Sequence, residues 1–264
     1  MRKKYYIGID IGSTAAKVVA LGEREIRFVL PTGWSSTETA RSIRERLEEE
    51  GICLADGLVV STGYGRRAVD YAHKQITEIT CHGAGCARTH PNCTIIDVGG
   101  QDTKVIRIRN GAVDDFLMND KCSAGTGKFI EVMANRLDCG IDQLFELAAQ
   151  GRVLPISSLC TVFAESEIIG HIGAGRRRED IAAGIVDSVA AKVGQMAGKL
   201  SAEKDVLLTG GLSHLPYFAK ALGEKLKISV TGLADGRYAG AYGAALLACR
   251  EAETAALGPA GEKE

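Results

Sequence analysis

The sequence predicts a duplicated α/β fold with two similar lobes, and three observations support this prediction. The segment IGIDIGSTAAKVVAL at residues 7–21 matches TIIDVGGQDTKVIRI at residues 94–108 at a constant offset, with acid, glycine and lysine in register. Each copy has an apolar strand, an Asp-x-Gly turn and a second strand, which is the pattern of a β-hairpin. The chain of 264 residues, with 45% hydrophobic and 25% charged residues, has the composition and length for two packed lobes.

Apolar periodicity and turn residues place the remaining elements in order. Strands are expected near residues 5–10, 17–21, 26–30 and 57–62, across 93–118, and at 205–209 and 227–231. Helices are expected near 36–50 (capped by Ser35 or Ser36), 65–73, 77–88, 125–138, 141–150, 162–174, 178–200, 215–226 and 238–252. Because helices follow each hairpin, we expect lobe I to comprise 1–92 plus 238–264, lobe II to comprise 93–237, and a cleft to lie between them.

Charge and hydropathy exclude several classes of protein. The formal net charge of −1 gives no reason to expect a nucleic acid or an anionic membrane as partner. No apolar run reaches the length of about 18 residues that spans a bilayer. The start MRKKYYIGIDIGST is interrupted by Asp10 and glycines, so it is interpreted as a first strand and not as a signal peptide. We therefore expect a cytoplasmic protein.

The two Asp-x-Gly turns carry residues suited to phosphate and magnesium. Glycines expose backbone N–H groups that cradle phosphate oxygens, and Lys17 adds a positive charge after the first turn. Asp10 and Asp97 end the first strand of each hairpin as anions suited to hydrated Mg²⁺. Gln101 in the second turn is a candidate for orienting a water or a phosphate oxygen.

A third glycine turn, in VLLTGGLSHLPYF at residues 206–218, ends a strand and allows a flat ring to approach the backbone. The paired turns and this Thr-Gly-Gly turn, in this order, predict nucleotide binding. They resemble the actin, Hsp70 and sugar-kinase ATPases, which implies two actin-like (ribonuclease H-like) lobes with ATP or ADP and Mg²⁺ in the cleft. The resemblance assigns Gly12, Ser13, Thr14, Ala15, Ala16 and Lys17 to the first phosphate loop, Gly99, Gly100 and Gln101 to the second, Gly210 and Gly211 to the adenosine turn, and Asp10 and Asp97 to the metal.

Two of the eight cysteines share an unusual context. Cys122 in MNDKCSAGTGKF and Cys160 in ISSLCTVFAESEIIGHIGAG each precede a predicted helix and follow or adjoin small polar residues. A helix N-terminus favours the thiolate, and its N–H groups can hydrogen-bond cluster sulfides. Two unrelated buried cysteines, a cysteine nucleophile, and a four-thiolate cluster completed by a second subunit all remain open on this evidence.

A rival ligand set is formed by Cys81, Cys86 and Cys93, with the spacing C-x4-C-x6-C. It matches plant-type ferredoxin spacing only at its first gap. The chain has no C-x-x-C pair, so a zinc ribbon or zinc finger is not expected. Most of the cysteines are therefore expected to be small buried side chains.

The pairing of NDKCSAGTGKFIEVMA with ISSLCTVFAESEII resembles the ATP-dependent activators (component A) of 2-hydroxyacyl-CoA dehydratases. These activators are grouped with the ATPase subunits of benzoyl-CoA reductases and the reductases of double-cubane-cluster proteins, and the match extends from GIDIGSTAAK to GAYGAALLA. The resemblance implies a homodimer with one oxygen-sensitive 4Fe-4S cluster held by Cys122 and Cys160 of both subunits. ATP hydrolysis would drive a low-potential electron from ferredoxin or flavodoxin through the cluster to a partner such as a 2-hydroxyacyl-CoA dehydratase.

Some positions are ambiguous. Where the family tends to have LAQYxGAxGA, this chain has LADGRYAGAYGA, which places Arg237 near the expected nucleotide. Glu165 and Glu167 follow Cys160, and Glu165 either links the cysteine helix to the nucleotide or is a solvated charge. The alternative functions are a sugar or carboxylate kinase of the same fold, with Asp102 as its base, and a nucleotide-gated sensor or scaffold.

Overall fold

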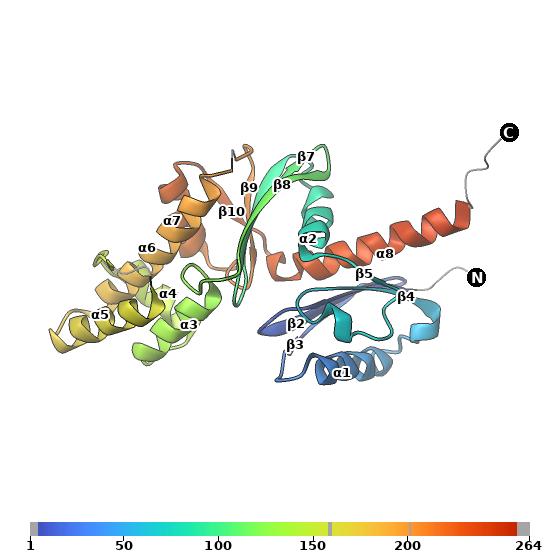
Figure 1. The fold of residues 1–264 in the computed structure, drawn as a ribbon, viewed down its shortest axis with the longest axis horizontal. Coiled ribbons are helices and arrows are strands. Elements are labelled where there is room, and N and C mark those ends of the chain that lie inside the picture. Colours follow the sequence, from blue (N-terminus) through green and yellow to red (C-terminus); the bar gives the residue numbers. More distant parts are fainter. Residues whose placement is uncertain (1–4, 158–159, 201, 258–264) are drawn as a thin grey trace. The chain divides into compact units, whose positions relative to one another are not determined.

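The computed structural model describes residues 5–157, 160–200 and 202–257, which form an α/β protein with two compact units (Figure 1). The first unit comprises the described residues of Met1–Pro91 and Tyr238–Glu264, and the second comprises those of Asn92–Arg237. Each unit contains one five-stranded sheet with both parallel and antiparallel neighbours. The α/β class with two similar halves, predicted from the repeat, is confirmed.

The sheet of the first unit is built around an antiparallel hairpin, with its strands in the order β3-β2-β1-β4-β5. Its strands are β1 (Tyr5–Ile11), β2 (Ala15–Leu21), β3 (Ile26–Pro31), β4 (Gly57–Thr62) and β5 (Lys74–Gln75). Its helices are α1 (Ser36–Glu49), α2 (Glu78–Ala87) and α8 (Ala239–Leu257), with short 3₁₀ turns at η1 (Leu54–Asp56) and η2 (Arg66–Ala68). A third 3₁₀ turn, η3 (Gly236–Tyr238), spans the boundary between the two units.

Alternation along β1 separates the two faces of this sheet, because successive side chains of a strand point to opposite sides. Ile7, Ile9 and Ile11 are fully buried in a cluster that includes Ile43 and Leu47 of α1. The other face lies under α8, whose alanines join β-strand residues in two small buried clusters. Helices therefore cover both faces of the sheet, as Figure 1 shows.

Glycines allow the backbone of α8 to lie in direct contact with the backbones of α2 and β1. A Cβ added to Gly8 of β1 would lie 1.9 Å from the Ala241 carbonyl oxygen, and one added to Gly85 of α2 would lie 2.3 Å from that of Ala239. At Gly243 of α8 the added Cβ would lie 1.7 Å from the Cys81 carbonyl oxygen. Such contacts are possible only for residues without a side chain.

Alanine at Gly243 is expected to destabilise the protein by about 3 kcal/mol, at the upper end of typical overpacking effects, because the obstructing atom belongs to the backbone. The free energy of unfolding in urea measures this effect. The matched control is Gly33→Ala, where an added Cβ meets no atom within 4 Å. Equal unfolding free energies for Gly243→Ala and the wild type would contradict the close packing of α2 on α8.

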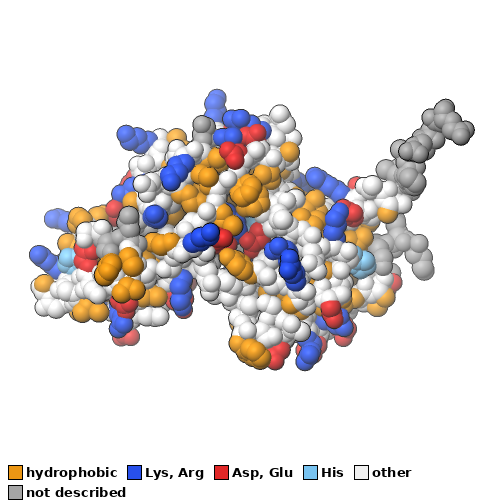
Figure 2. All heavy atoms as spheres, in the orientation of Figure 1, with side chains coloured by type: hydrophobic (Ala, Val, Ile, Leu, Met, Phe, Trp, Pro, Cys, Tyr) orange, Lys and Arg blue, Asp and Glu red, His pale blue; other side chains and the backbone are white. Residues whose placement is uncertain are grey.

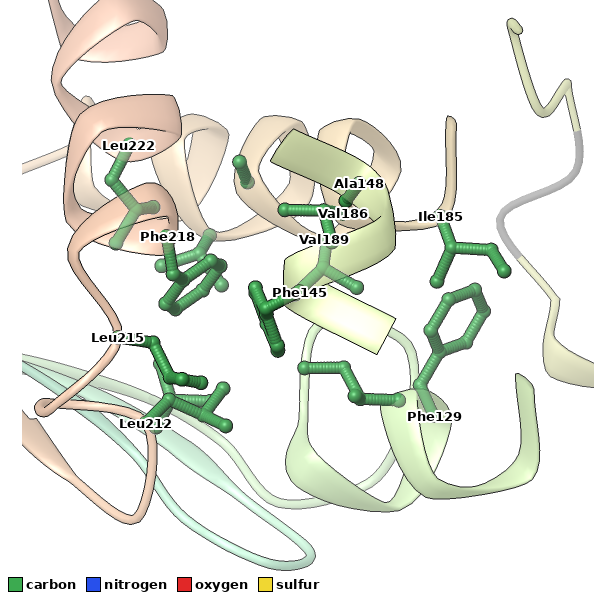
Figure 3. Packing of buried hydrophobic residues seen from close by; sticks show 14 of the residues in the cluster. Phe129, Phe145, Ala148, Ile185, Val186, Val189, Leu212, Leu215, Phe218 and Leu222 are labelled. Atoms are coloured by element: carbon green, nitrogen blue, oxygen red, sulfur yellow. The ribbon is translucent and has the colours of Figure 1, made fainter. Parts of the chain in front are cut away.

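The second unit repeats the plan of the first, with strand order β10-β9-β6-β7-β8. Its strands are β6 (Cys93–Val98), β7 (Thr103–Arg109), β8 (Ala112–Asn119), β9 (Val206–Gly210) and β10 (Val230–Gly232). Its helices are α3 (Gly127–Arg136), α4 (Ile141–Gln150), α5 (Thr161–Gly173), α6 (Arg178–Ala197) and α7 (Pro216–Leu226). These helices contribute to one large hydrophobic core, in which Phe145 and Phe218 meet edge to face with ring centroids 5.7 Å apart (Figure 3).

Local signals explain which predicted elements form. Ser35 is the N-cap of α1, since its side chain accepts a hydrogen bond from the Glu38 N–H at 3.4 Å. The predicted helix over 65–73 is wrong, because that segment contains only the turn η2. There, Gly65 donates its N–H to the Ile11 carbonyl oxygen at 2.9 Å, which holds the chain against β1. None of the helices in the described part of the chain is long and apolar enough to cross a membrane.

Candidate functional site

The two Asp-x-Gly turns have the same backbone geometry. In the first unit Asp10 of β1 is paired with Lys17 of β2, and in the second Asp97 of β6 is paired with Lys104 of β7. The Gly12 N–H donates to the Ala15 carbonyl oxygen at 3.2 Å, and the Gly99 N–H donates to that of Asp102 at 2.9 Å. The sequence repeat is therefore a structural repeat, with each acid at the same place beside a glycine turn.

A second repeated feature lies next to each acid and was missed by the sequence reasoning. Thr62-Gly63 ends β4 beside Asp10, as Thr209-Gly210 ends β9 beside Asp97. Gly63 and Gly210 have φ angles of +90° and +83°, and an added Cβ would lie 2.6 Å from Asp10 Oδ1 and 2.9 Å from Asp97 Oδ1, respectively. The signal was present in the sequence, since VVSTG at residues 59–63 resembles VLLTG at 206–210.

The charged groups of the first turn, Asp10 and Lys17, form no ion pair with each other or with another described residue. Asp10 is only 5% exposed, and its Oδ1 atom has no hydrogen-bond partner among the described residues. The Nζ atom of Lys17 lies over the turn, 3.3 Å from the position of a Cβ on Gly12. A buried carboxylate oxygen without a partner is costly unless a cation or a water completes it. The residues of this turn therefore fit a magnesium ion held through water near Asp10 and a phosphate near Lys17.

The second turn has an internal ion-pair network instead. Lys104 is buried, and its Nζ atom lies 2.8 Å from Asp102 Oδ2 and 3.4 Å from Asp97 Oδ2. Asp97 Oδ1 accepts a hydrogen bond from the Thr209 hydroxyl at 3.0 Å. Lys104 is therefore a structural counterion, whereas its counterpart Lys17 makes no ion pair within the described part of the chain.

Asp102 was the candidate base of the kinase alternative. Its carboxylate is buried, paired with Lys104, and within 2.3 Å of where a Cβ on Gly99 would stand. Because this carboxylate is committed to a buried ion pair inside the turn, it is not placed to take a proton from a substrate hydroxyl. The kinase alternative therefore loses the residue on which it depended.

The other predicted residues of the first two turns differ in burial, since Ala16 is fully buried in β2. Thr14 and Gln101 are exposed, and Ser13 is half-buried. Thr32 was not predicted to contribute, yet it supports the first turn by donating its hydroxyl to the Gly12 carbonyl oxygen at 2.8 Å and its N–H to that of Thr14 at 3.0 Å. Its role depends on the return of β3 beside β2, which no local motif encodes.

The Thr-Gly-Gly turn joins β9 to α7. An added Cβ at Gly211 would meet nothing within 4 Å, so the space above this glycine is open. Gly236 packs on the same turn, because a Cβ there would lie 2.6 Å from Ser213 Oγ. Arg237, which follows Gly236 directly, is exposed.

The two candidate cluster cysteines lie on segments that touch. Cys122 and Cys160 are both exposed, and their neighbours Ser123 and Thr161 share a hydroxyl hydrogen bond of 2.7 Å. Cys160 is the N-cap residue of α5, as expected. The Asn119 side-chain amide donates to the Cys122 carbonyl oxygen at 2.8 Å and shapes the loop that carries this cysteine. The structure thus brings together two cysteines that are far apart in the sequence.

The N-terminus of α3 is used differently from the prediction. The N–H groups at the glycine turn and helix start after Cys122 were expected to hydrogen-bond cluster sulfides. Two of the N–H groups at this helix start are those of Gly127 and Lys128. They donate instead to the carbonyl oxygens of Gly99 and Gly100, at 2.9 and 2.8 Å. The first turn of α3 is therefore bound to the second Asp-x-Gly turn, and these two N–H groups are used there.

The two glutamates after Cys160 hold α5 in place. Glu165 forms an ion pair with Arg136 of α3, so it links the cysteine helix to the helix that contacts the second turn. The Glu167 carboxylate accepts hydrogen bonds from the N–H and the hydroxyl of Ser157, both at 3.0 Å. Ser157 is therefore held to the body of α5.

Cys81, Cys86 and Cys93 are buried, the first two on α2 and the third at the start of β6. Burial raises the pKa of the Cys81 thiol and of the Cys93 thiol to about 12, which favours the protonated form of each. Within the described ranges, no three or more His, Cys, Asp and Glu side chains are grouped to hold a metal ion. These cysteines thus have the environment of small apolar core residues.

The duplicated hairpin turns, each beside a Thr-Gly pair, define the class of protein: an actin-like ATPase fold. A solved structure of the activator of 2-hydroxyisocaproyl-CoA dehydratase from Clostridium difficile, with bound ADPNP, has this fold with a TM-score of 0.90. It is 36% identical in sequence, and the match covers 98% of this chain and 100% of that chain. The chain belongs to the BadF/BadG/BcrA/BcrD ATPase family, whose model matches residues 7–248.

Curated relatives of similar sequence are also named as activators of dehydratases. The (R)-2-hydroxyglutaryl-CoA dehydratase activating ATPase of Acidaminococcus fermentans is 43% identical over 255 residues, covering 94% of this chain and 98% of the relative. The activator of lactoyl-CoA dehydratase of Anaerotignum propionicum is 41% identical over 256 residues, covering 94% and 99%. The resemblance to dehydratase activators stated from the sequence motifs is confirmed by these comparisons.

Proposed function

We propose that the protein is a homodimeric ATPase that uses nucleotide hydrolysis to deliver single low-potential electrons to a partner enzyme. The observation that carries the proposal is the hydrogen-bonded connection between the second Asp-x-Gly turn and the segments of two exposed cysteines. A kinase has no use for such a connection, whereas an ATP-driven electron carrier requires its nucleotide and redox sites to communicate.

ATP and Mg²⁺ are the proposed ligands of the glycine turns. In the first turn, Lys17 would contact phosphate oxygens and the unpaired Asp10 carboxylate oxygen would orient a hydrated magnesium ion. Gly99, Gly100 and Gln101 would contact phosphate from the second turn, and Gly210, Gly211 and Arg237 would surround the adenosine. The ADPNP bound to the Clostridium difficile activator supports a nucleotide of this kind.

Cys122 and Cys160 fit half of a 4Fe-4S ligand set, because such clusters take four thiolates. The two thiols are exposed, their segments are in contact, and two chains related by a twofold axis would supply all four. A 4Fe-4S group bound there would supply a one-electron redox centre. Asn119 and Glu167 would keep the two cysteine segments in position.

The exposed face of α5 supports a dimer that places these cysteines together. Val162 and Phe163 are 65% and 67% exposed, and Ile169 and Ile172 are also exposed, all on the helix that begins after Cys160. Figure 2 shows hydrophobic side chains among charged ones on the surface around this part of the second unit. Large exposed apolar side chains on one helix favour a protein–protein contact, and a second copy would also complete the cluster.

The partner enzyme is proposed to be a 2-hydroxyacyl-CoA dehydratase or a related iron–sulfur reductase, with ferredoxin or flavodoxin as electron donor. The names of the relatives support the first of these, since several activate acyl-CoA dehydratases. A benzoyl-CoA reductase subunit from Thauera aromatica, 30% identical over 275 residues, supports the second.

Anaerobic purification and reconstitution with iron and sulfide test the proposal. We expect a dimer by light scattering, with about four iron atoms per dimer and Mg²⁺-dependent ATP hydrolysis. The reduced protein should transfer electrons to an acyl-CoA dehydratase only when ATP is present. A monomeric ATPase that holds no iron after reconstitution would overturn the electron-transfer function and leave only the ATPase.

A further inference from the structure

We propose that the Ser123 and Thr161 hydroxyls are positioning groups that transmit movement of the second Asp-x-Gly turn to Cys160. The inference rests on the proposed function in treating Cys122 and Cys160 as a functional pair. Two consecutive contacts within the second unit carry it, one from the turn to the Cys122 loop and one from that loop to α5.

The first contact joins the turn to the Cys122 loop. The Gly127 and Lys128 N–H groups donate to the Gly99 and Gly100 carbonyl oxygens, at 2.9 and 2.8 Å. The Thr103 hydroxyl, at the start of β7, donates to the Gly125 carbonyl oxygen at 2.7 Å. These three hydrogen bonds, at Gly125, Gly127 and Lys128, tie the loop to the turn and to the strand after it, so a movement of the turn also moves the loop.

The fit between these segments is also tight. A Cβ on Gly127 would lie 3.1 Å from the Gly99 carbonyl oxygen, so the α3 N-terminus lies directly on the turn. Thr126 then fixes the loop to the start of α3, since its hydroxyl and its N–H both donate to the Ser123 carbonyl oxygen, at 2.7 and 3.0 Å. Ser123 and the adjacent Cys122 are therefore held to the first turn of α3.

The second contact passes from the Cys122 loop to α5. The hydroxyls of Ser123 and Thr161 lie 2.7 Å apart, and each residue directly follows a cysteine of the pair. Because Thr161 is the first residue of α5 and Cys160 is its N-cap, a displacement of Ser123 acts on the helix at the cysteine. Glu167 of α5 also accepts hydrogen bonds from Ser157.

An ion pair also links α5 to α3, and buried side chains of the two helices belong to the same hydrophobic core. Glu165 lies one turn after Thr161 on the same helix face and forms an ion pair with Arg136. The Arg136 side chain is 53% exposed, and exposed ion pairs of this kind contribute little. The hydroxyl pair joins the residues that directly follow the two cysteines, so it is a direct link between the two cysteine segments.

The test uses the full chain without iron, so that it does not depend on a cluster. Alkylation rates of Cys122 and Cys160 by iodoacetamide are measured by peptide mass spectrometry with ADP and with a non-hydrolysable ATP analogue. In the wild type, we expect the rate at each cysteine to differ between the two nucleotides. In Thr161→Val and in Ser123→Ala, we expect the difference to persist at Cys122 and to be lost at Cys160.

Thr161→Ser keeps the hydroxyl and is expected to retain the difference at Cys160, which separates the hydrogen bond from a general effect on folding. Thermal melts of each variant check that the fold is intact, and Ser123→Ala decides the outcome if Thr161→Val does not fold. An unchanged difference at Cys160 in Ser123→Ala would overturn the proposal, as would a wild type in which neither cysteine responds to nucleotide. Failure of the proposed function is recognised separately, by absence of iron and electron transfer in the reconstituted wild type.

Discussion

Serine in place of Cys122 or Cys160 is expected to abolish iron binding and to reduce electron delivery by more than about 100-fold. Substitutions that only support metal ligands already cost ~10–100-fold, and loss of a ligand exceeds this effect. Each substitution removes two of four thiolates from a symmetric dimer, and a serine hydroxyl does not form the anion that iron requires at neutral pH. Nucleotide binding should remain, because neither cysteine belongs to the glycine turns.

The measurements are iron and sulfide content after anaerobic reconstitution, and the rate of electron transfer to a dehydratase. Cys53→Ser is the matched control, because Cys53 is also exposed but lies in the first unit. We expect this control to keep the iron content of the wild type. A Cys122→Ser protein with a full complement of iron would show that the cluster, if present, has other ligands.

Replacing Asp10 with asparagine is expected to lower the rate of ATP hydrolysis by about 100-fold or more, since a metal ion contributes several kcal/mol to charge stabilisation at phosphate. The asparagine has the same shape but no charge, so the magnesium concentration needed for half-maximal rate should rise. The Oδ1 atom of Asp10 is buried and has no hydrogen-bond partner in the described residues. This carboxylate oxygen is therefore the proposed acceptor for a water of the magnesium ion.

Steady-state hydrolysis at several magnesium concentrations measures both effects. Asp56→Asn provides the control, because it removes an equal charge from an exposed position of the same unit. An Asp10→Asn protein with the rate and the magnesium dependence of the wild type would disprove the assignment of this carboxylate to the metal.

Local patterns made much of the fold predictable from the sequence. Both Asp-x-Gly hairpins, the Ser35 cap and the Thr-Gly-Gly turn depend on residues close together in the chain, so their signals are complete in short windows. The segment over 65–73 misled the prediction because its helical composition competes with the backbone contact of Gly65 on β1. The hydrophobic periodicity of residues 65–73 and that of β1 do not reveal this contact, because the two segments are far apart in the chain.

The candidate site was predictable in its parts but not in its connections. The sequence indicated that Lys17 and Lys104 are equivalent, and the register confirms it. Their different environments depend on Asp102, which occupies the position where the first turn has Ala15 and supplies Lys104 with a buried partner. Likewise, the similar contexts of Cys122 and Cys160 suggested a shared role, whereas the contact of Ser123 with Thr161 depends on how α5 folds back on α3.

The return of α8 to the first unit determines the order in which the chain can fold during synthesis. The core of this unit includes Val19 and Val60 beside Ala244 and Ala245, so its last layer is made only after α8 has been translated. The second unit is continuous from Asn92 to Arg237, and all of its core is available earlier. On the ribosome, the first unit is therefore begun before the second unit and completed after it, and the β1–β4 surface that α8 covers stays exposed in the meantime.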